Sequence, residues 1–190
     1  MSTKNIMIVG VGGQGTLLAS RILGDLLVSE GYDVKVSEVH GMSQRGGSVV
    51  TYVKYGEKVY SPIIDKGEAD IILSFEMLEA YRALPYLKKG GKLITNTQKT
   101  NPMPVITGAA EYPENIGEKL AAVCDVTLVD ALALAKEAGN IKSLNVALIG
   151  VLARNSEIAR DKFIESIKKC VPAKFLEANL KAFELGYRGE

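Results

Sequence analysis

Residues 6–15 read Ile-Met-Ile-Val-Gly-Val-Gly-Gly-Gln-Gly, a compact apolar run that passes directly into a glycine-rich loop. From Thr16 to Ser29, leucine and isoleucine then recur at helical spacing, and Gly31 supplies a stop. A strand, a glycine loop and a helix in this order let a ligand approach the backbone closely, and the free N–H groups at the helix start face an anion. We expect a phosphate or pyrophosphate at Gly10, Gly12, Gly13 and Gly15, with the Gln14 amide as a further donor. A purely structural turn is the alternative.

Short apolar runs alternate with helical stretches along the rest of the chain, which is typical of an α/β protein. The strands expected after the first are Asp33–Val39, Ala69–Phe75, Lys92–Thr95 and Val126–Val129. The helices expected after the first are Met77–Lys88, Glu114–Val123, Ala131–Ala138, Leu144–Asn155, Glu157–Cys170 and Ala173–Leu185. Ser48–Tyr55 and Lys58–Tyr60 flank Gly56 and predict a hairpin. Residues 1–190 are therefore expected to form one domain, a doubly wound, mostly parallel Rossmann-like sheet with helices on both faces and an inserted β-hairpin.

Charge and targeting signals are weak in this chain. Lys and Arg number 23 against 22 for Asp and Glu, so no bulk field attracts nucleic acid or an acidic membrane. The start lacks an apolar signal core, and no apolar run approaches the roughly 20 residues that span a bilayer. We expect a cytoplasmic protein whose function lies in local sites.

Cysteine usage argues against a metal centre. Cys124 and Cys170 are far apart in the sequence, and the chain has 1 histidine. A tetrahedral site needs four such ligands, so we expect neither structural zinc nor an iron–sulfur cluster held by this chain alone. Both cysteines are expected to be small buried apolar residues.

A second polar, glycine-rich segment spans residues 37–50 and reads Ser-Glu-Val-His-Gly-Met-Ser-Gln-Arg-Gly-Gly-Ser-Val-Val. Arg45, Gly46 and Gly47 are able to form a concave patch of backbone donors. His40, Ser43 and Gln44 add polar side chains beside them. Singly, these residues also fit ordinary turn or surface roles, but the cluster indicates a pocket or a partner surface.

Two further positions follow from Rossmann geometry. Glu38 ends the second strand, where a dinucleotide fold places the carboxylate that binds a ribose hydroxyl, although no second crossover helix follows it. Asn96 and Thr97 follow a strand end and are expected to line the same crevice, with an ordinary strand exit as the alternative.

Together these segments resemble a known family. The glycine loop, the run from Ser37 to Val50, Tyr60-Ser61-Pro62, Asn96-Thr97-Gln98 and the segment from Asn179 to Gly186 are similar to the gamma-domain family of 2-oxoacid:ferredoxin oxidoreductases. The similarity spans essentially the whole chain and is strongest to the members that act on indolepyruvate.

The resemblance implies one subunit of an enzyme that decarboxylates an aryl 2-oxoacid oxidatively with coenzyme A, giving an arylacetyl-CoA, CO2 and reduced ferredoxin. A larger alpha subunit would carry thiamine diphosphate and the iron–sulfur clusters, and this chain alone would be inactive. Coenzyme A would be the phosphate-bearing ligand of both glycine segments. His40 would act as a positioning group.

Other functions remain open at this stage. Within the family, the rival is the gamma subunit of a pyruvate or branched-chain 2-oxoacid enzyme. Outside it, a stand-alone NAD(P) oxidoreductase and a non-catalytic scaffold subunit are alternatives.

Overall fold

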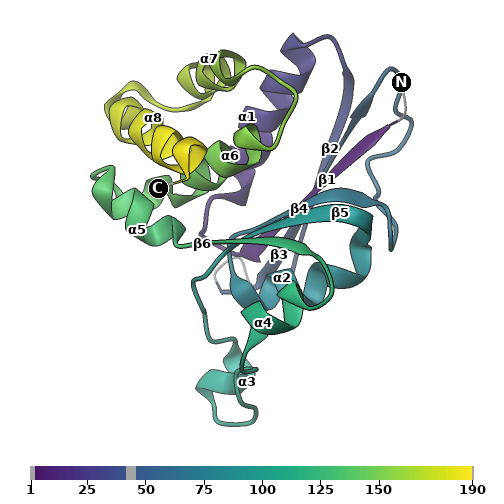
Figure 1. Ribbon diagram of the computed structural model, residues 1–190, viewed down its shortest axis with the longest axis vertical. Coiled ribbons are helices and arrows are strands. Elements are labelled where there is room, and N and C mark those ends of the chain that lie inside the picture. Colours follow the sequence, from purple (N-terminus) through teal and green to yellow (C-terminus); the bar gives the residue numbers. More distant parts are fainter. Residues whose placement is uncertain (1–2, 42–45, 190) are drawn as a thin grey trace.

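The protein is described by a computed structural model over residues 3–41 and 46–189 (Figure 1). Its centre is a six-stranded sheet in the order β2-β3-β1-β4-β5-β6. The strands are β1 (Lys4–Val11), β2 (Asp33–His40), β3 (Ser48–Gly56), β4 (Ala69–Ser74), β5 (Leu87–Asn96) and β6 (Asp125–Val129). From β1 through β4 and β5 to β6 the pairing is parallel, whereas β3 pairs antiparallel with both β1 and β2. The sheet is mostly parallel, as expected.

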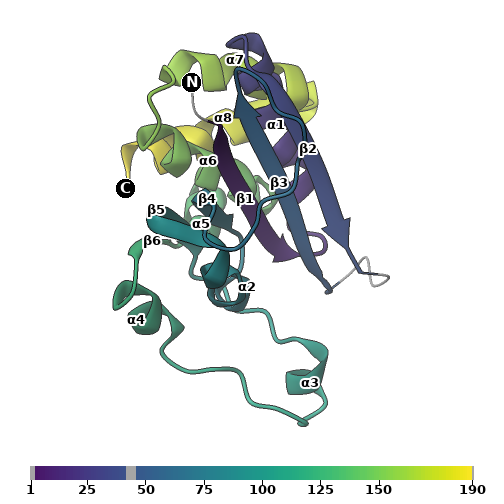
Figure 2. The ribbon, with the colours of Figure 1, turned by 90° about the vertical axis from the view of Figure 1, so that its right-hand side faces the viewer.

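Helices cover both faces of the sheet (Figures 1 and 2). One face carries α1 (Thr16–Ser29), α5 (Ala131–Glu137), α6 (Leu144–Arg154), α7 (Arg160–Cys170) and α8 (Ala173–Arg188). The other carries α2 (Met77–Ala83) and α4 (Ile116–Ala121). Side chains of β1 alternate between the two cores, with Ile6 and Ile8 against the first group and Met7 and Val9 against the second. The predicted doubly wound architecture is confirmed.

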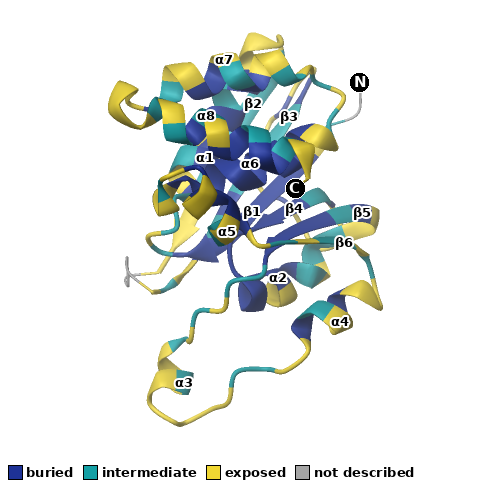
Figure 3. Cartoon of the chain, turned by 60° about the vertical axis from the view of Figure 1, so that its left-hand side comes forward, coloured by how far each residue is buried: buried dark blue, intermediate teal, exposed yellow. Residues whose placement is uncertain are grey.

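The first core depends on a close crossing of α6 and α8. A Cβ at Gly150 would lie 2.2 Å from the Phe183 carbonyl oxygen, and one at Gly186 would lie 2.0 Å from that of Ala147. Only glycine fits at these positions, because the two backbones touch. Residues 145–153 of α6 are buried throughout. Figure 3 shows this helix dark along its length.

The predicted hairpin of Ser48–Tyr55 with Lys58–Tyr60 does not form, and β3 forms a hairpin with the preceding strand β2 instead. Residues 57–60 form no strand, and β3 pairs instead with β2 along its length, from Asp33 opposite Gly56 to His40 opposite Val49. Val59 is 4% exposed, and its N–H donates to Asp33 Oδ2 at 2.9 Å. The segment expected to be a strand is therefore an irregular, largely exposed connection anchored by the buried Val59, and β3 is inserted between β2 and β1.

The second departure concerns α2 and β5. The helix stops at Ala83, a 3₁₀ turn spans Leu84–Tyr86, and β5 already begins at Leu87. Pro85 has no N–H and disfavours continuation of the helix. Gly90 and Gly91, which lie between the predicted helix and the predicted strand, are inside β5, where the pairing shifts register. A Cβ at Gly91 would lie 2.9 Å from the Ala69 carbonyl oxygen. Glycine here permits a bulge rather than ending a helix.

A long excursion leaves the body between β5 and α4. It carries the short helix α3 (Met103–Ile106), which the sequence did not predict, and projects away from the sheet (Figures 1 and 3). Among the residues described, no helix combines the length and the apolar character required to cross a membrane.

Candidate functional site

The two glycine segments meet at the carboxyl end of β1. The Gly12 N–H donates to the Gly47 carbonyl at 2.9 Å, and the Gly46 N–H donates to the Gly12 carbonyl at 3.5 Å. These contacts extend the antiparallel pairing of β1 with β3, in which Val11 lies opposite Ser48. The structure thus brings Gly12, Gly46 and Gly47 together, although they are distant in the sequence.

The start of α1 has the features of an anion site. Its N-cap is Gly15, which has a φ of 85°, makes no side-chain capping bond, and is followed by no acidic residue in the first turn. Gly13 is exposed, with a φ of 102° and no atom within 4 Å of a Cβ built on it. First-turn N–H groups without a cap carry a partial positive charge that suits a phosphate. The Gly12 N–H, however, is already used by Gly47.

Gln14 is engaged inside the protein rather than presented to a ligand. Its Oε1 accepts the Val11 N–H at 2.8 Å, and its Nε2 donates to the Phe75 carbonyl at 3.2 Å. A Cβ at Gly10 would lie 2.9 Å from this Oε1, which explains the glycine there. Gln14 therefore ties the loop to β1 and to the end of β4.

Asn96 performs the same function for β5. It is 0% exposed, so it does not line a crevice wall as expected. Its Nδ2 donates to the Phe75 carbonyl at 3.2 Å and its Oδ1 accepts the Ala131 N–H at 3.2 Å. Thr97 is half-buried, and its N–H donates to the Val129 carbonyl at 2.9 Å. The Phe75 carbonyl thus joins the ends of β1, β4 and β5.

Glu38 and His40 lie on β2, at the edge of the sheet. Both are exposed; Glu38 Oε2 accepts the Thr51 hydroxyl at 3.3 Å, and His40 Nδ1 lies 3.2 Å from the Gly41 carbonyl oxygen. Because β3 separates β2 from β1, Glu38 is two strand spacings, about 10 Å, from the glycine loop. A dinucleotide fold has these two strands adjacent. The predicted site residues Ser43, Gln44 and Arg45 lie outside the described residues.

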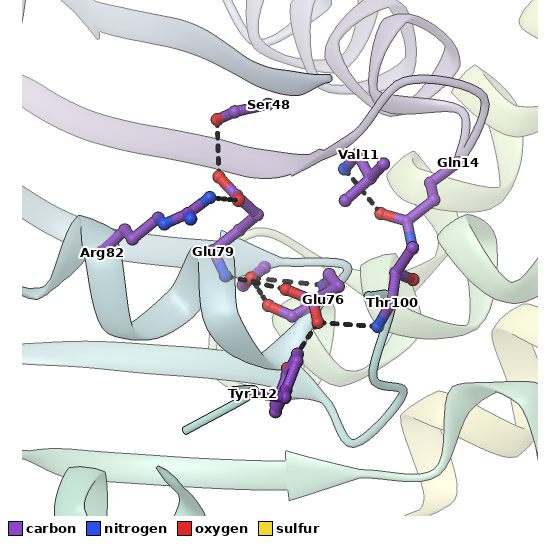
Figure 4. A network of polar contacts seen from close by, with 9 residues as sticks. Val11, Gln14, Ser48, Glu76, Glu79, Arg82, Thr100 and Tyr112 are labelled. Atoms are coloured by element: carbon purple, nitrogen blue, oxygen red, sulfur yellow. Dashed lines mark hydrogen bonds and ion pairs between the residues drawn. The ribbon is translucent and has the colours of Figure 1, made fainter. Parts of the chain in front are cut away.

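A buried carboxylate that the sequence analysis missed is Glu76. It is 1% exposed and caps α2, with Oε2 accepting the Glu79 N–H at 2.8 Å. Its Oε1 accepts the Thr100 N–H at 3.0 Å and the Tyr112 hydroxyl at 2.6 Å (Figure 4). Burial, together with this carboxylate, raises the pKa of Tyr112. Glu76 thus fastens both ends of the excursion that carries α3.

Glu79 lies one turn further along α2 and reaches the second glycine segment. It is 5% exposed, and its Oε2 accepts the Ser48 hydroxyl at 2.5 Å while its Oε1 accepts from Arg82 Nη1 at 2.6 Å (Figure 4). In an open α/β sheet, the residues that follow a strand end line the ligand site. Applied after β4, as it was after β5, this rule points to Glu76 and Glu79.

Asn145 is a third residue of the site that the sequence did not reveal. It is 2% exposed on α6, and its Nδ2 donates to the Gly15 carbonyl at 3.1 Å. A Cβ at Gly15 would lie 2.5 Å from the same nitrogen. No local pattern reveals this contact, because it joins residues 130 positions apart.

Two cavities are relevant to the location of the site. One of about 410 Å³ lies at the neck of the excursion and is lined by Lys99, Asn101 and residues 112–115. Another, of about 700 Å³, opens at the amino-terminal edge of the sheet, beside Lys4, Tyr55 and residues 88–91. Since the glycine segments lie at the carboxyl edge, the larger cavity is remote from them.

Both cysteines are half-buried rather than buried as expected, and they lie on opposite faces of the sheet. Cys124 packs against the core under α2 and α4, whereas Cys170 packs against the core of the opposite face. Burial raises the pKa of both thiols, which disfavours the thiolate that a cluster requires. Among residues 3–41 and 46–189, no group of three His, Cys, Asp or Glu is placed to hold a metal ion.

The chain matches known proteins over nearly its full length. Residues 5–189 match the family described as pyruvate ferredoxin/flavodoxin oxidoreductase. The indolepyruvate oxidoreductase subunit IorB of Thermococcus kodakarensis is 45% identical, over 99% of this chain and 96% of that protein. The common gamma subunit of the pyruvate/ketoisovalerate oxidoreductases of Thermococcus litoralis is 27% identical, over 87% of this chain and 83% of that protein.

A solved structure shares the fold. It is 2-oxoglutarate:ferredoxin oxidoreductase from Magnetococcus marinus with 2-oxoglutarate, coenzyme A and succinyl-CoA bound, and it has a TM-score of 0.74 at 18% identity. The likeness covers 100% of this chain and 32% of that one. With a matching sequence over nearly its full length and a matching fold, the chain belongs to the pyruvate ferredoxin/flavodoxin oxidoreductase family, in agreement with the resemblance seen in its sequence.

Proposed function

We propose that this chain is the smaller subunit of an indolepyruvate:ferredoxin oxidoreductase and supplies part of its coenzyme A site. The observation that carries the proposal is the 45% identity to an indolepyruvate oxidoreductase subunit over nearly the whole of both chains. The rival, a gamma subunit of a pyruvate or branched-chain 2-oxoacid enzyme, is supported by only 27% identity.

The coenzyme A site is placed at the start of α1 on physical grounds. Coenzyme A carries a diphosphate, and the first-turn N–H groups after Gly15 have no side-chain cap and no acidic neighbour in the turn. Gly13 is open to solvent, so a ligand has access to the backbone. The second segment, which is bonded to the first through Gly47, would form the other wall. His40 belongs to this segment and stands at the end of β2, where it would position the ligand.

The remaining cofactors are assigned to a larger partner subunit. Thiamine diphosphate supplies the carbanion chemistry of decarboxylation, and iron–sulfur clusters carry the electrons. The thiols of this chain lie on opposite sheet faces and have raised pKa values, so they do not suit a cluster. This chain would bind and orient coenzyme A beside the partner's reaction centre and would be inactive alone.

A charge placed in the first turn of α1 tests the assignment. Leu17 is 57% exposed there, and Leu17→Glu sets a carboxylate beside the site proposed for the diphosphate. The variant should fold normally, since an acidic first turn stabilises a helix. We expect its Kd for coenzyme A, measured by calorimetry on the assembled complex, to rise at least tenfold.

Leu17→Gln is the matched control, because it has the shape of glutamate without the charge, and it should bind coenzyme A within about twofold of the wild type. Equal binding by both variants and the wild type contradicts the placement at α1. Indolepyruvate-dependent ferredoxin reduction, compared with pyruvate-dependent reduction, separates the two substrate classes. Tight NAD(P) binding by the isolated chain would instead support a stand-alone oxidoreductase.

A further inference from the structure

The Glu79 side chain is a buried carboxylate that the proposed coenzyme A contacts leave without a function. It is 5% exposed, and burying a carboxylate is costly unless hydrogen bonds and a counter-charge compensate. Both oxygens are engaged, Oε2 by the Ser48 hydroxyl at 2.5 Å and Oε1 by Arg82 Nη1 at 2.6 Å. A buried carboxylate with both oxygens hydrogen-bonded fixes the position of the groups that it bonds to.

What Glu79 holds is the end of the second glycine segment. Ser48 is the first residue of β3 and directly follows Gly47, whose carbonyl accepts the Gly12 N–H at 2.9 Å. Two adjacent residues therefore connect this segment in two directions. Gly47 joins it to the first glycine loop, and Ser48 joins it to α2, as Figure 4 shows. Loss of the Ser48 contact leaves this end of the segment joined to the first glycine loop and to β1, but no longer to α2.

Arg82 orients the carboxylate. It lies three residues after Glu79 on the same helix, and its side chain is 52% exposed. A half-exposed ion pair adds little stability by itself. The ion pair instead orients the Glu79 carboxylate, because one oxygen is fixed on Arg82 and the other then faces Ser48.

We propose that Glu79 is a positioning residue, which through Ser48 sets the distance between the two glycine segments and thereby the affinity for coenzyme A. The inference rests on the proposed function. A ligand site loses affinity when its walls are displaced by small amounts, because part of the binding free energy is then used to restore the geometry that the ligand requires.

The test compares variants of the assembled complex by calorimetry with coenzyme A and by steady-state kinetics. Glu79→Gln and Ser48→Ala should each raise the Kd for coenzyme A at least fivefold, with the KM for the 2-oxoacid unchanged. Ser48→Thr keeps the hydroxyl and should bind within twofold of the wild type. The double variant should be no weaker than Glu79→Gln alone, because both changes break one contact.

Glu184→Gln provides the matched control. Glu184, on α8, accepts from Arg160 Nε at 3.3 Å, away from the glycine segments, and its loss should leave the Kd for coenzyme A unchanged. If the Glu79→Gln variant fails to assemble, Ser48→Ala, a change at an exposed residue, decides the question. An unchanged Kd for coenzyme A in Ser48→Ala overturns the inference. An equal rise in the KM for coenzyme A and the KM for the 2-oxoacid does so as well. If Leu17→Glu weakens coenzyme A binding while Ser48→Ala does not, the proposed function stands and this inference alone fails.

Discussion

At the scale of single residues, the site depends on amide side chains that bond to backbone rather than to a ligand. Gln14 and Asn96 both donate to the Phe75 carbonyl, and Asn145 donates to the carbonyl of Gly15. Backbone groups at strand ends have no partner in the sheet, and burial makes an unpaired one costly. These amides supply the missing partners and so fix the glycine loop.

Asn145 offers a direct test of this view. Asn145→Ala removes the contact with Gly15 and should lower the free energy of unfolding by about 1–2 kcal/mol. Urea denaturation measures the change. Asn101→Ala, an exposed position on the excursion, should stay within about 0.5 kcal/mol of the wild type. Equal effects of the two changes would contradict a bracing role for Asn145.

Tyr55 predicts a pH dependence. Burial, and then the neighbouring Tyr32, raise its pKa from 10.0 to about 12. Below pH 10 the hydroxyl is protonated in both states; between pH 10 and 12 it ionises more readily in the unfolded chain. Stability should therefore fall as pH rises through this window. In Tyr55→Phe the fall, followed by urea titration at successive pH values, should be shallower, whereas Tyr60→Phe, at an 89% exposed side chain, should behave as the wild type.

At the scale of elements, most predictions from the sequence were correct where periodicity is local. The bounds of α1 are exactly those predicted, and β2, β4, β6 and α5 through α8 lie within three residues of expectation. The failures are the end of α2 with the start of β5, the hairpin, and α3, which was not predicted. Gly90-Gly91 resembles a helix stop in sequence but forms a bulge, because Gly91 must approach the backbone of β4. Lys58–Tyr60 has strand composition but is held by Asp33.

The crossing of α6 and α8 gives a contrast between two helix glycines. Gly150→Ala places a Cβ 2.2 Å from a backbone oxygen and should lower the free energy of unfolding by about 3 kcal/mol or more. Gly24→Ala, within α1, meets its nearest neighbour at 3.8 Å and should be neutral or stabilise the protein by about 0.5–1 kcal/mol. Thermal denaturation of both variants checks the signs, and a mild Gly150→Ala would show that the helices are able to separate.

At the scale of the whole molecule, the fold places two cysteines where they have no common ligand. The double variant Cys124→Ser, Cys170→Ser should leave the iron content of the assembled complex unchanged and its turnover within about twofold, because these half-buried thiols pack against separate cores. Iron analysis and ferredoxin reduction measure both. A loss of iron would assign a cluster ligand to this chain and contradict the proposed division of cofactors.

The sequence alone was enough to predict the α/β class, the glycine loop, its helix and the family, because each depends on residues that are neighbours along the chain. Strand order required the tertiary structure: β3 lies between β1 and β2, which removes Glu38 from the loop and with it the main argument for a nicotinamide site. The partners of Gly15 and Ser48 were likewise invisible, since Asn145 and Glu79 come from distant helices. Local patterns determine elements, whereas hydrogen bonds between distant segments are determined only when the sheet has assembled.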